Sequence, residues 1–240
     1  MLFRSSYLWY LFPTGASRIY GYDTGSNQSF QSNVLPSGAN ATERDGLHGL
    51  CIPMKKEVIF GPFADQCLGN SSSCDSFTIS FLAHVNGAVA ENEDVHILYS
   101  TPLTQGLFHV QFTVTRTVSR LEGQAYIVGG NSSTLLERKG LFPGVNTWVH
   151  VAIVYSQSRQ ELDLYMNSVK VTDPTTTIPW NNRRSAVNVS LASTGNIKEI
   201  CVSYFQIIND AMKETEIQQL EHESRTQGEF KTTADVVEHL

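Results

Sequence analysis

The sequence lacks the features of a nucleic-acid-binding or membrane-spanning protein. Its 240 residues include 17 lysines and arginines and 23 aspartates and glutamates, a formal net charge of −6. A phosphate backbone is bound by clustered basic side chains, and only Lys55-Lys56 and Arg183-Arg184 come close to a cluster. No apolar run approaches the ~20 residues of a membrane helix. The composition therefore disfavours nucleic acid as a partner and predicts no membrane span within this chain.

Common catalytic and metal-binding signatures are also missing. The sequence has no Gly-x-Ser-x-Gly elbow of a hydrolase and no Cys-x-x-Cys or Cys-x-x-His pair for zinc. The 7 histidines show no metal-ligand spacing. Four of them fall in predicted strands, and we interpret these as structural: His84, His96, His109 and His150.

Apolar residues are plentiful, at 41% of the chain, so a sizeable core can form. The run Tyr7–Phe12 follows Arg4 but is too short for a signal peptide and precedes no cleavage site. We interpret it as a core strand. Because both ends look unfinished, we expect the chain to be part of a larger protein.

Strand-like segments recur between turn signals along most of the chain. They are rich in Val, Ile, Phe, Tyr and Thr, and many alternate apolar with polar residues. This regular spacing of short strands and turns predicts an all-β sandwich or jelly roll rather than βαβ units. A modest apolar stripe predicts one helix over 213–223. The predicted strands cover residues 57–60, 77–85, 94–99, 107–115, 125–128, 147–155, 161–167, 187–192 and 200–208.

Two neighbouring segments differ in their pattern. Residues 148–155 are apolar on both faces, which predicts a central strand covered on both sides. In residues 161–166 the apolar positions alternate, so Glu161, Asp163 and Tyr165 are expected to face solvent.

Cysteines and glycosylation sequons predict an extracellular, secretory protein. The cysteines are four, an even number, and five Asn-x-Ser/Thr sequons are present, none with a central proline. The sequon asparagines are Asn27, Asn40, Asn70, Asn131 and Asn188.

The disulfide connectivity has three possibilities. Cys67 and Cys74 bracket a short polar loop, which a bond would pin. Cys51 and Cys201 open apolar segments near opposite ends of the chain and would meet if the first and last strands pair.

Several motifs resemble the laminin G-like and pentraxin-like jelly rolls of the concanavalin A-like superfamily. W-x-H-V-A-x-x-Y at 148–155 is followed by L-x-L-Y-x-N at 162–167 and V-x-V at 169–171. The resemblance implies a concanavalin A-like jelly-roll sandwich of two antiparallel sheets with one short C-terminal helix. This domain would cover residues 7–222, and residues 223–240 would form a polar tail or the start of a linker. Further segments also agree in order: YLWYLFPTGASRIYGY at 7–22, CLGNSSSCDSFTISF at 67–81 and ICVSYFQIINDAMKETEI at 200–217.

The sequence departs from the family pattern at three positions. Leu82 replaces the usual Trp, Ser168 replaces the Gly of an Asn-Gly turn, and Lys213 replaces a Ser or Thr helix cap. These departures indicate a divergent copy of the fold.

The resemblance also raises two site chemistries. Some superfamily glucanases carry E-x-D-x-E on a strand, and Glu161-Leu162-Asp163-Leu164-Tyr165 lacks its final acid, so we predict that the chain is not an enzyme. Other relatives bind calcium. The acidic loop Glu91-Asn92-Glu93-Asp94 and the loop carboxylates Asp65, Asp75 and Asp173 could offer oxygen ligands. The pentraxin calcium cluster is not recognisable, so we assign no metal and no cofactor, and calcium stays an open alternative.

The resemblance and the sequons together predict a noncatalytic recognition or adhesion module, part of a larger extracellular receptor or matrix protein. Its ligand would be a glycan or a protein. The alternatives are a structural spacer domain and a degenerate glycoside hydrolase.

Overall fold

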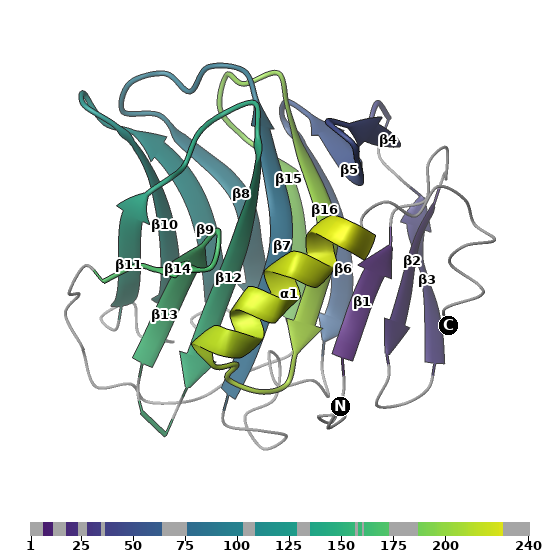
Figure 1. Ribbon diagram of the computed structural model, residues 1–240. Helices are drawn as coiled ribbons and strands as arrows, with labels where there is room; N and C mark the ends of the chain where they lie inside the picture. The colour runs from purple at the N-terminus through teal and green to yellow at the C-terminus, as the bar shows by residue number, and fades with distance from the viewer. Residues whose placement is uncertain are drawn as a thin grey trace.

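Two antiparallel sheets face each other in the computed structural model of the protein, and one helix crosses the outer face of the larger sheet (Figure 1). The predicted all-β class with two sheets and one helix is confirmed. The structure describes residues 7–11, 18–23, 28–34, 37–63, 76–102, 109–128, 135–156, 158–159, 161–172 and 187–227.

The larger sheet, sheet A, follows the order β14-β13-β12-β7-β16-β1-β2-β3, and β5 also pairs with β16 and carries β4. All its pairings are antiparallel. Its strands are β1 (Tyr7–Leu11), β2 (Arg18–Asp23), β3 (Gln28–Val34), β4 (Asn40–Arg44), β5 (Leu47–Pro53), β7 (Ser76–Asn86), β12 (Trp148–Ser156), β13 (Glu161–Met166), β14 (Val169–Lys170) and β16 (Glu199–Ile208).

The smaller sheet, sheet B, follows the order β11-β10-β9-β8-β15-β6. Its pairings are also antiparallel. Its strands are β6 (Lys56–Phe63), β8 (Asp94–Pro102), β9 (His109–Arg116), β10 (Leu121–Val128), β11 (Leu135–Leu141) and β15 (Val187–Ser193).

The core lies between the two sheets. Phe81 on β7 meets Phe112 on β9 edge to face, with ring centroids 5.9 Å apart, and so joins the sheets. Every residue of β12 is buried. Its inward face joins this core, whereas Ala152 and Val154 on the opposite face pack with Ile217 of the helix. The predicted central strand, covered on both sides, is confirmed.

The helix α1 (Glu214–Gln227) ends four residues beyond the expected end at 223, inside the segment expected to be a tail. Lys213, which lacks a capping side chain, donates its backbone N–H to Glu216 Oε2 at 2.7 Å. This contact is half of a capping box and compensates for the missing Ser or Thr. Within the described part of the chain, no helix is both long and apolar enough to cross a membrane.

Two positions on β13 contradict the expectation of solvent-facing side chains. Tyr165 is buried with Ile217 under α1, and Asp163 is buried with its carboxylate 2.9 Å from Lys170 Nζ. The helix and the β13–β14 hairpin cover this face. Alternation within one strand identifies the two faces, but it does not reveal that a distant helix covers the second one.

Candidate functional site

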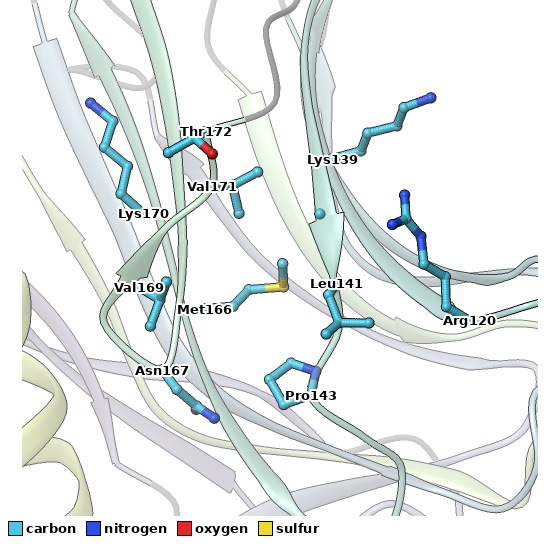
Figure 2. Close-up of a pocket in the computed structure, with 11 residues that line it drawn as sticks. Arg120, Lys139, Leu141, Pro143, Met166, Asn167, Val169, Lys170, Val171 and Thr172 are labelled. Carbon is cyan, nitrogen blue, oxygen red and sulfur yellow. The ribbon is translucent and has the colours of Figure 1, made fainter.

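A groove lies between the edges of the two sheets, where β11 of sheet B approaches β13 and β14 of sheet A (Figure 2). We call it the edge groove. Its volume is about 450 Å³, within the range of ligand-binding pockets. It is lined by Arg120, Lys139, Gly140, Leu141, Pro143, Met166, Asn167, Val169, Lys170, Val171 and Thr172.

A glycine pair determines the shape of the groove. Gly123 on β10 and Gly140 on β11 are register partners. A Cβ on Gly123 would lie 2.6 Å from Met166 Sδ, and one on Gly140 would lie 2.8 Å from Val171 Cγ1. Both distances are shorter than real Cβ contacts, so the two glycines allow Met166 of β13 and Val171, which follows β14, to approach sheet B closely.

Two exposed aliphatic side chains border the groove on its opposite sides. Leu141 at the end of β11 is 63% exposed, and Val169 on β14 is 69% exposed. Met166 lies between them in Figure 2. Large apolar side chains that converge on one concavity are a feature of binding sites, whereas scattered ones are not.

The charges on the groove are all positive. Arg120 pairs with Glu122 at 2.7 Å, and Lys170 pairs with Asp163 at 2.9 Å. Lys139 has no ion pair within the described part of the chain. Lys139 and Lys170 extend on opposite sides of the groove (Figure 2). Among its described lining residues there is no carboxylate and no aromatic ring.

The helix holds the turn that forms one wall. Asn167 and Ser168 both have positive φ, of 48° and 59°. This conformation is uncommon for residues other than glycine, and asparagine adopts it more readily than serine. Ser168 Oγ donates to Glu221 Oε2, and Arg225 donates to Asn167 Oδ1 at 3.1 Å. Arg225 also pairs with Glu221 at 2.9 Å. We call this set of contacts the helix clamp, and it fixes the β13–β14 hairpin.

His150 lies beneath this turn and is fully buried. Its Nε2 is 2.9 Å from Ser80 Oγ, and its backbone N–H donates to Asn167 Oδ1 at 2.9 Å. Burial lowers the pKa of His150 to about 4, with opposing smaller effects of Glu221 and Arg225. The imidazole is therefore neutral at pH 7 and packs as a structural residue, as predicted.

The other predicted histidines do not come together. His84 lies on β7 of sheet A, and its Nε2 is 3.0 Å from Asp45 Oδ2. His96 and His109 lie on β8 and β9 of sheet B but are not register partners. His96 Nδ1 accepts from Gln111 Nε2 at 2.7 Å. The side-chain hydrogen bonds of His84 and His96 thus go to separate partners, Asp45 and Gln111.

The carboxylates of the acidic loop are engaged in local contacts. Glu93 Oε1 accepts the N–H of Asn196 at 2.6 Å, and Oε2 accepts the N–H of Ala90 at 3.1 Å. Asp94 Oδ1 accepts from Thr115 Oγ1 at 2.5 Å. These contacts tether the loop to its neighbours. No metal was assigned here from the sequence, and calcium stays the open alternative. Asp65, Asp75 and Asp173 lie outside the described residues.

Cys51 and Cys201 are register partners on β5 and β16, and a disulfide joins them. Their sulfurs lie within 4.8 Å of a Glu199 carboxylate oxygen, which forms the group of three potential metal ligands in the described residues. Because the sulfurs are bonded to each other, they cannot act as thiolate ligands. Cys67 and Cys74 lie outside the described residues.

Two of the five sequon asparagines are placed by the structure. Asn40 is exposed on β4, and Asn188 lies on β15. Asn27, Asn70 and Asn131 lie outside the described residues.

The glucanase-like motif on β13 does not form a carboxylate pair across a cleft. Asp163 is paired with Lys170, and Tyr165 is buried at the position of the missing acid. A glycosidase needs two carboxylates that face each other across the scissile bond.

Sequence reasoning did not find the edge groove. Its walls come from segments separated by some tens of residues, and its cations and aliphatic residues have no spacing that marks a site. The one local signal was Ser168, which departs from the Asn-Gly turn of the family pattern and follows Asn167 in the groove wall.

The described residues thus form a β-sandwich with a groove between the edges of its two sheets. No family model matches the sequence, and no curated protein is significantly similar to it. Among solved structures, the binding domain of botulinum neurotoxin serotype D is similar, with a TM-score of 0.65 and 10% identity over 90% of this chain and 50% of that chain.

Two further solved structures have the same fold. The serotype D ligand-binding domain in complex with N-acetylneuraminic acid has a TM-score of 0.66 and 11% identity, and covers 90% of this chain and 50% of that chain. The binding domain of Paraclostridial mosquitocidal protein 1 has a TM-score of 0.59 and 16% identity, and covers 88% and 51%. The chain thus spans about half the length of these proteins. At such low identity the likeness shows the fold alone.

Proposed function

We propose that the chain is a noncatalytic recognition module of an extracellular protein, and that its ligand binds in the edge groove. The groove itself is the observation that carries the proposal. It is a concavity of about 450 Å³ with aliphatic walls and basic side chains at its margin. Two sheets and the helix clamp hold it in place, so a ligand would meet a largely preformed site.

The fold neighbours support recognition as the role. They are binding domains: the serotype D domain was solved in complex with N-acetylneuraminic acid, and the binding domain of botulinum neurotoxin DC in complex with SialylT. The sequence motifs that resemble laminin G-like and concanavalin A-like jelly rolls point the same way. Because this chain spans about half of those proteins, they support binding in general as its role, without identifying its ligand.

The extracellular location rests on the disulfide and the sequons. The Cys51–Cys201 bond joins strands far apart in sequence, and such bonds persist in oxidising compartments. Asn40 is exposed and available for glycosylation. An adhesion or receptor role within a larger protein is consistent with these features.

The test is a parallel screen of a glycan array and an array of extracellular proteins with the purified, secreted chain. Leu141→Glu places a charge on the groove wall, and Val118→Glu is the matched control, because Val118 is 84% exposed and does not line the groove. We expect a ligand whose binding falls about tenfold or more with Leu141→Glu alone, equivalent to ~1.4 kcal/mol. Blank arrays would contradict the proposal and favour a structural spacer. Binding that is insensitive to Leu141→Glu would contradict the placement of the ligand in the edge groove.

A further inference from the structure

We infer that the ligand of the edge groove is an extended polypeptide segment that pairs with the free edge of β11 and inserts an aliphatic side chain flanked by carboxylates. This inference rests on the proposed function, because it names the class of ligand for the same site. Three observations carry it: the strand edge, the aliphatic walls and the sign of the charge.

The edge of β11 has no partner strand on its outer side among the described strands. β11 stands at the end of sheet B, paired with β10 through seven register positions, from Glu122↔Leu141 to Val128↔Leu135. An edge strand of this length leaves alternate backbone N–H and C=O groups available to another strand. Because Lys139, Gly140 and Leu141 of β11 line the groove, a strand that pairs with this edge would lie along it.

The walls fit a branched aliphatic side chain. Leu141 and Val169 present exposed methyl groups on either side, and Met166 lies between them (Figure 2). Methionine adapts its shape to different partners, which suits a pocket for an aliphatic residue. In strand addition, backbone bonds supply affinity and such pockets supply side-chain specificity.

The charge at the groove selects acidic neighbours for that side chain. Arg120, Lys139 and Lys170 line the groove without a carboxylate among the described lining residues, although the chain as a whole carries a net charge of −6. Arg120 and Lys170 are already paired, so Lys139 is the cation with most to gain from an incoming carboxylate. A local positive site on a negative protein favours an acidic partner.

A sugar fits this groove less well. The described lining offers no aromatic ring to stack against a sugar face. Asn167, whose carboxamide could serve a sugar hydroxyl, already accepts from His150 N–H and Arg225 through its Oδ1. A hydroxyl-rich ligand placed against Leu141 and Met166 would lose hydrogen bonds to water without replacement.

The test uses a random heptapeptide library displayed on phage and selected on the purified full chain. We expect enriched peptides to carry Asp or Glu beside Leu, Ile or Val. Synthetic peptides from the selection are then measured by fluorescence anisotropy against four variants. Lys139→Glu and Leu141→Glu should each weaken binding about tenfold or more. Lys56→Glu, an exposed cation on β6 at the other edge of sheet B, and Val118→Glu should leave binding within about twofold.

Backbone pairing has its own signature. Two versions of the peptide are compared, one N-methylated at the odd-numbered residues and the other at the even-numbered residues. One version should lose binding and the other should keep most of it, because alternate N–H groups point toward the partner strand. An equal effect at all positions would overturn strand addition. Groove-dependent binding of a glycan and of no peptide would overturn the inference and leave the proposed function standing. The absence of any ligand sensitive to Leu141→Glu would overturn both.

Discussion

Gly123 and Gly140 lie directly opposite each other on β10 and β11. Met166 of β13 and Val171, just after β14, occupy the space that their missing side chains leave. This relationship sets the distance between the two sheet edges. It therefore connects the packing of the sandwich to the shape of the edge groove.

Gly140→Ala tests this packing. Its new Cβ would lie 2.8 Å from Val171 Cγ1, so we expect a loss of about 1–3 kcal/mol in the free energy of unfolding. The double variant with Val171→Ala should recover part of the loss, because it removes the clashing methyl groups. Gly144→Ala is the control, since its Cβ would meet Thr147 at an ordinary 3.6 Å. Urea unfolding measures all three, and equal stability of Gly140→Ala and Gly144→Ala would refute the packing.

The disulfide between Cys51 and Cys201 should contribute strongly to stability. It closes a loop with a sequence separation of 150, for which the chain-entropy model gives about 5 kcal/mol. We expect Cys51→Ala/Cys201→Ala to lower the urea midpoint markedly. Cys67→Ala/Cys74→Ala tests the second predicted bond, whose short loop would give a smaller effect of about 2 kcal/mol. A double variant at 51 and 201 as stable as the wild type would contradict the account.

Stability should fall in mild acid because of His150. Its pKa is about 4 in the folded protein and about 6.5 when unfolded, so the unfolded state binds the proton first as the pH drops. We expect the stability to hold above pH ~6.5 and to decline by about 3 kcal/mol toward pH ~4. His150→Gln should remove most of this decline. Burial lowers the pKa of His84 too, so a smaller decline should remain. Thermal unfolding across pH measures the difference, and identical profiles would be inconsistent with a neutral buried His150.

The helix clamp should control the β13–β14 hairpin. Glu221→Ala removes the acceptor of both Ser168 and Arg225, and we expect a loss of about 1–3 kcal/mol. Hydrogen exchange should rise in residues 164–171, because the hairpin loses its anchor. Gln218→Ala, at an exposed position of the same helix, is the control. Unchanged exchange in the hairpin of Glu221→Ala would show that the helix does not hold it.

Asn40 should carry a glycan when the chain is expressed through the secretory pathway. Its side chain is exposed on β4, and Thr42 completes the sequon. Peptide mass spectrometry after enzymatic deglycosylation should find Asn40 converted to Asp. Thr42→Ala should abolish the conversion while leaving Asn40 in place. Secreted protein with unmodified Asn40 would count against the glycoprotein interpretation.

The sequence was most informative where long apolar runs are buried. The segments of β7, β12 and β16 carry dense apolar patterns, and each was predicted within one or two residues. β3, β4, β5 and β11 were missed. The sequences of β4 and β11, NATER and LLERKGL, are polar or charged, and their strand conformation depends on hydrogen bonds to β5 and β10. β5 is buried over most of its length, but His48 and Gly49 interrupt its apolar pattern.

The edge groove could not be predicted from the sequence, for a related reason. The groove forms because β11 and β14 are the edge strands of their sheets and lie next to each other, which brings together Arg120, Leu141 and Val169. The order of strands in a sheet cannot be predicted from any one segment of the sequence. The same limit explains why the burial of Asp163 was not predicted. Its partner Lys170 and the covering helix come from elements whose placement depends on the whole sheet.

The most direct test of the edge groove follows the methyl group of Met166. The chain has 4 methionines, so a spectrum of the protein with isotope-labelled methionine methyl groups is simple. Titration with a ligand found in the screens should shift the Met166 signal, because its side chain lines the groove. Met54 and Met212, which do not line it, should stay in place. A ligand that saturates the chain and leaves Met166 unmoved would contradict binding at the edge groove.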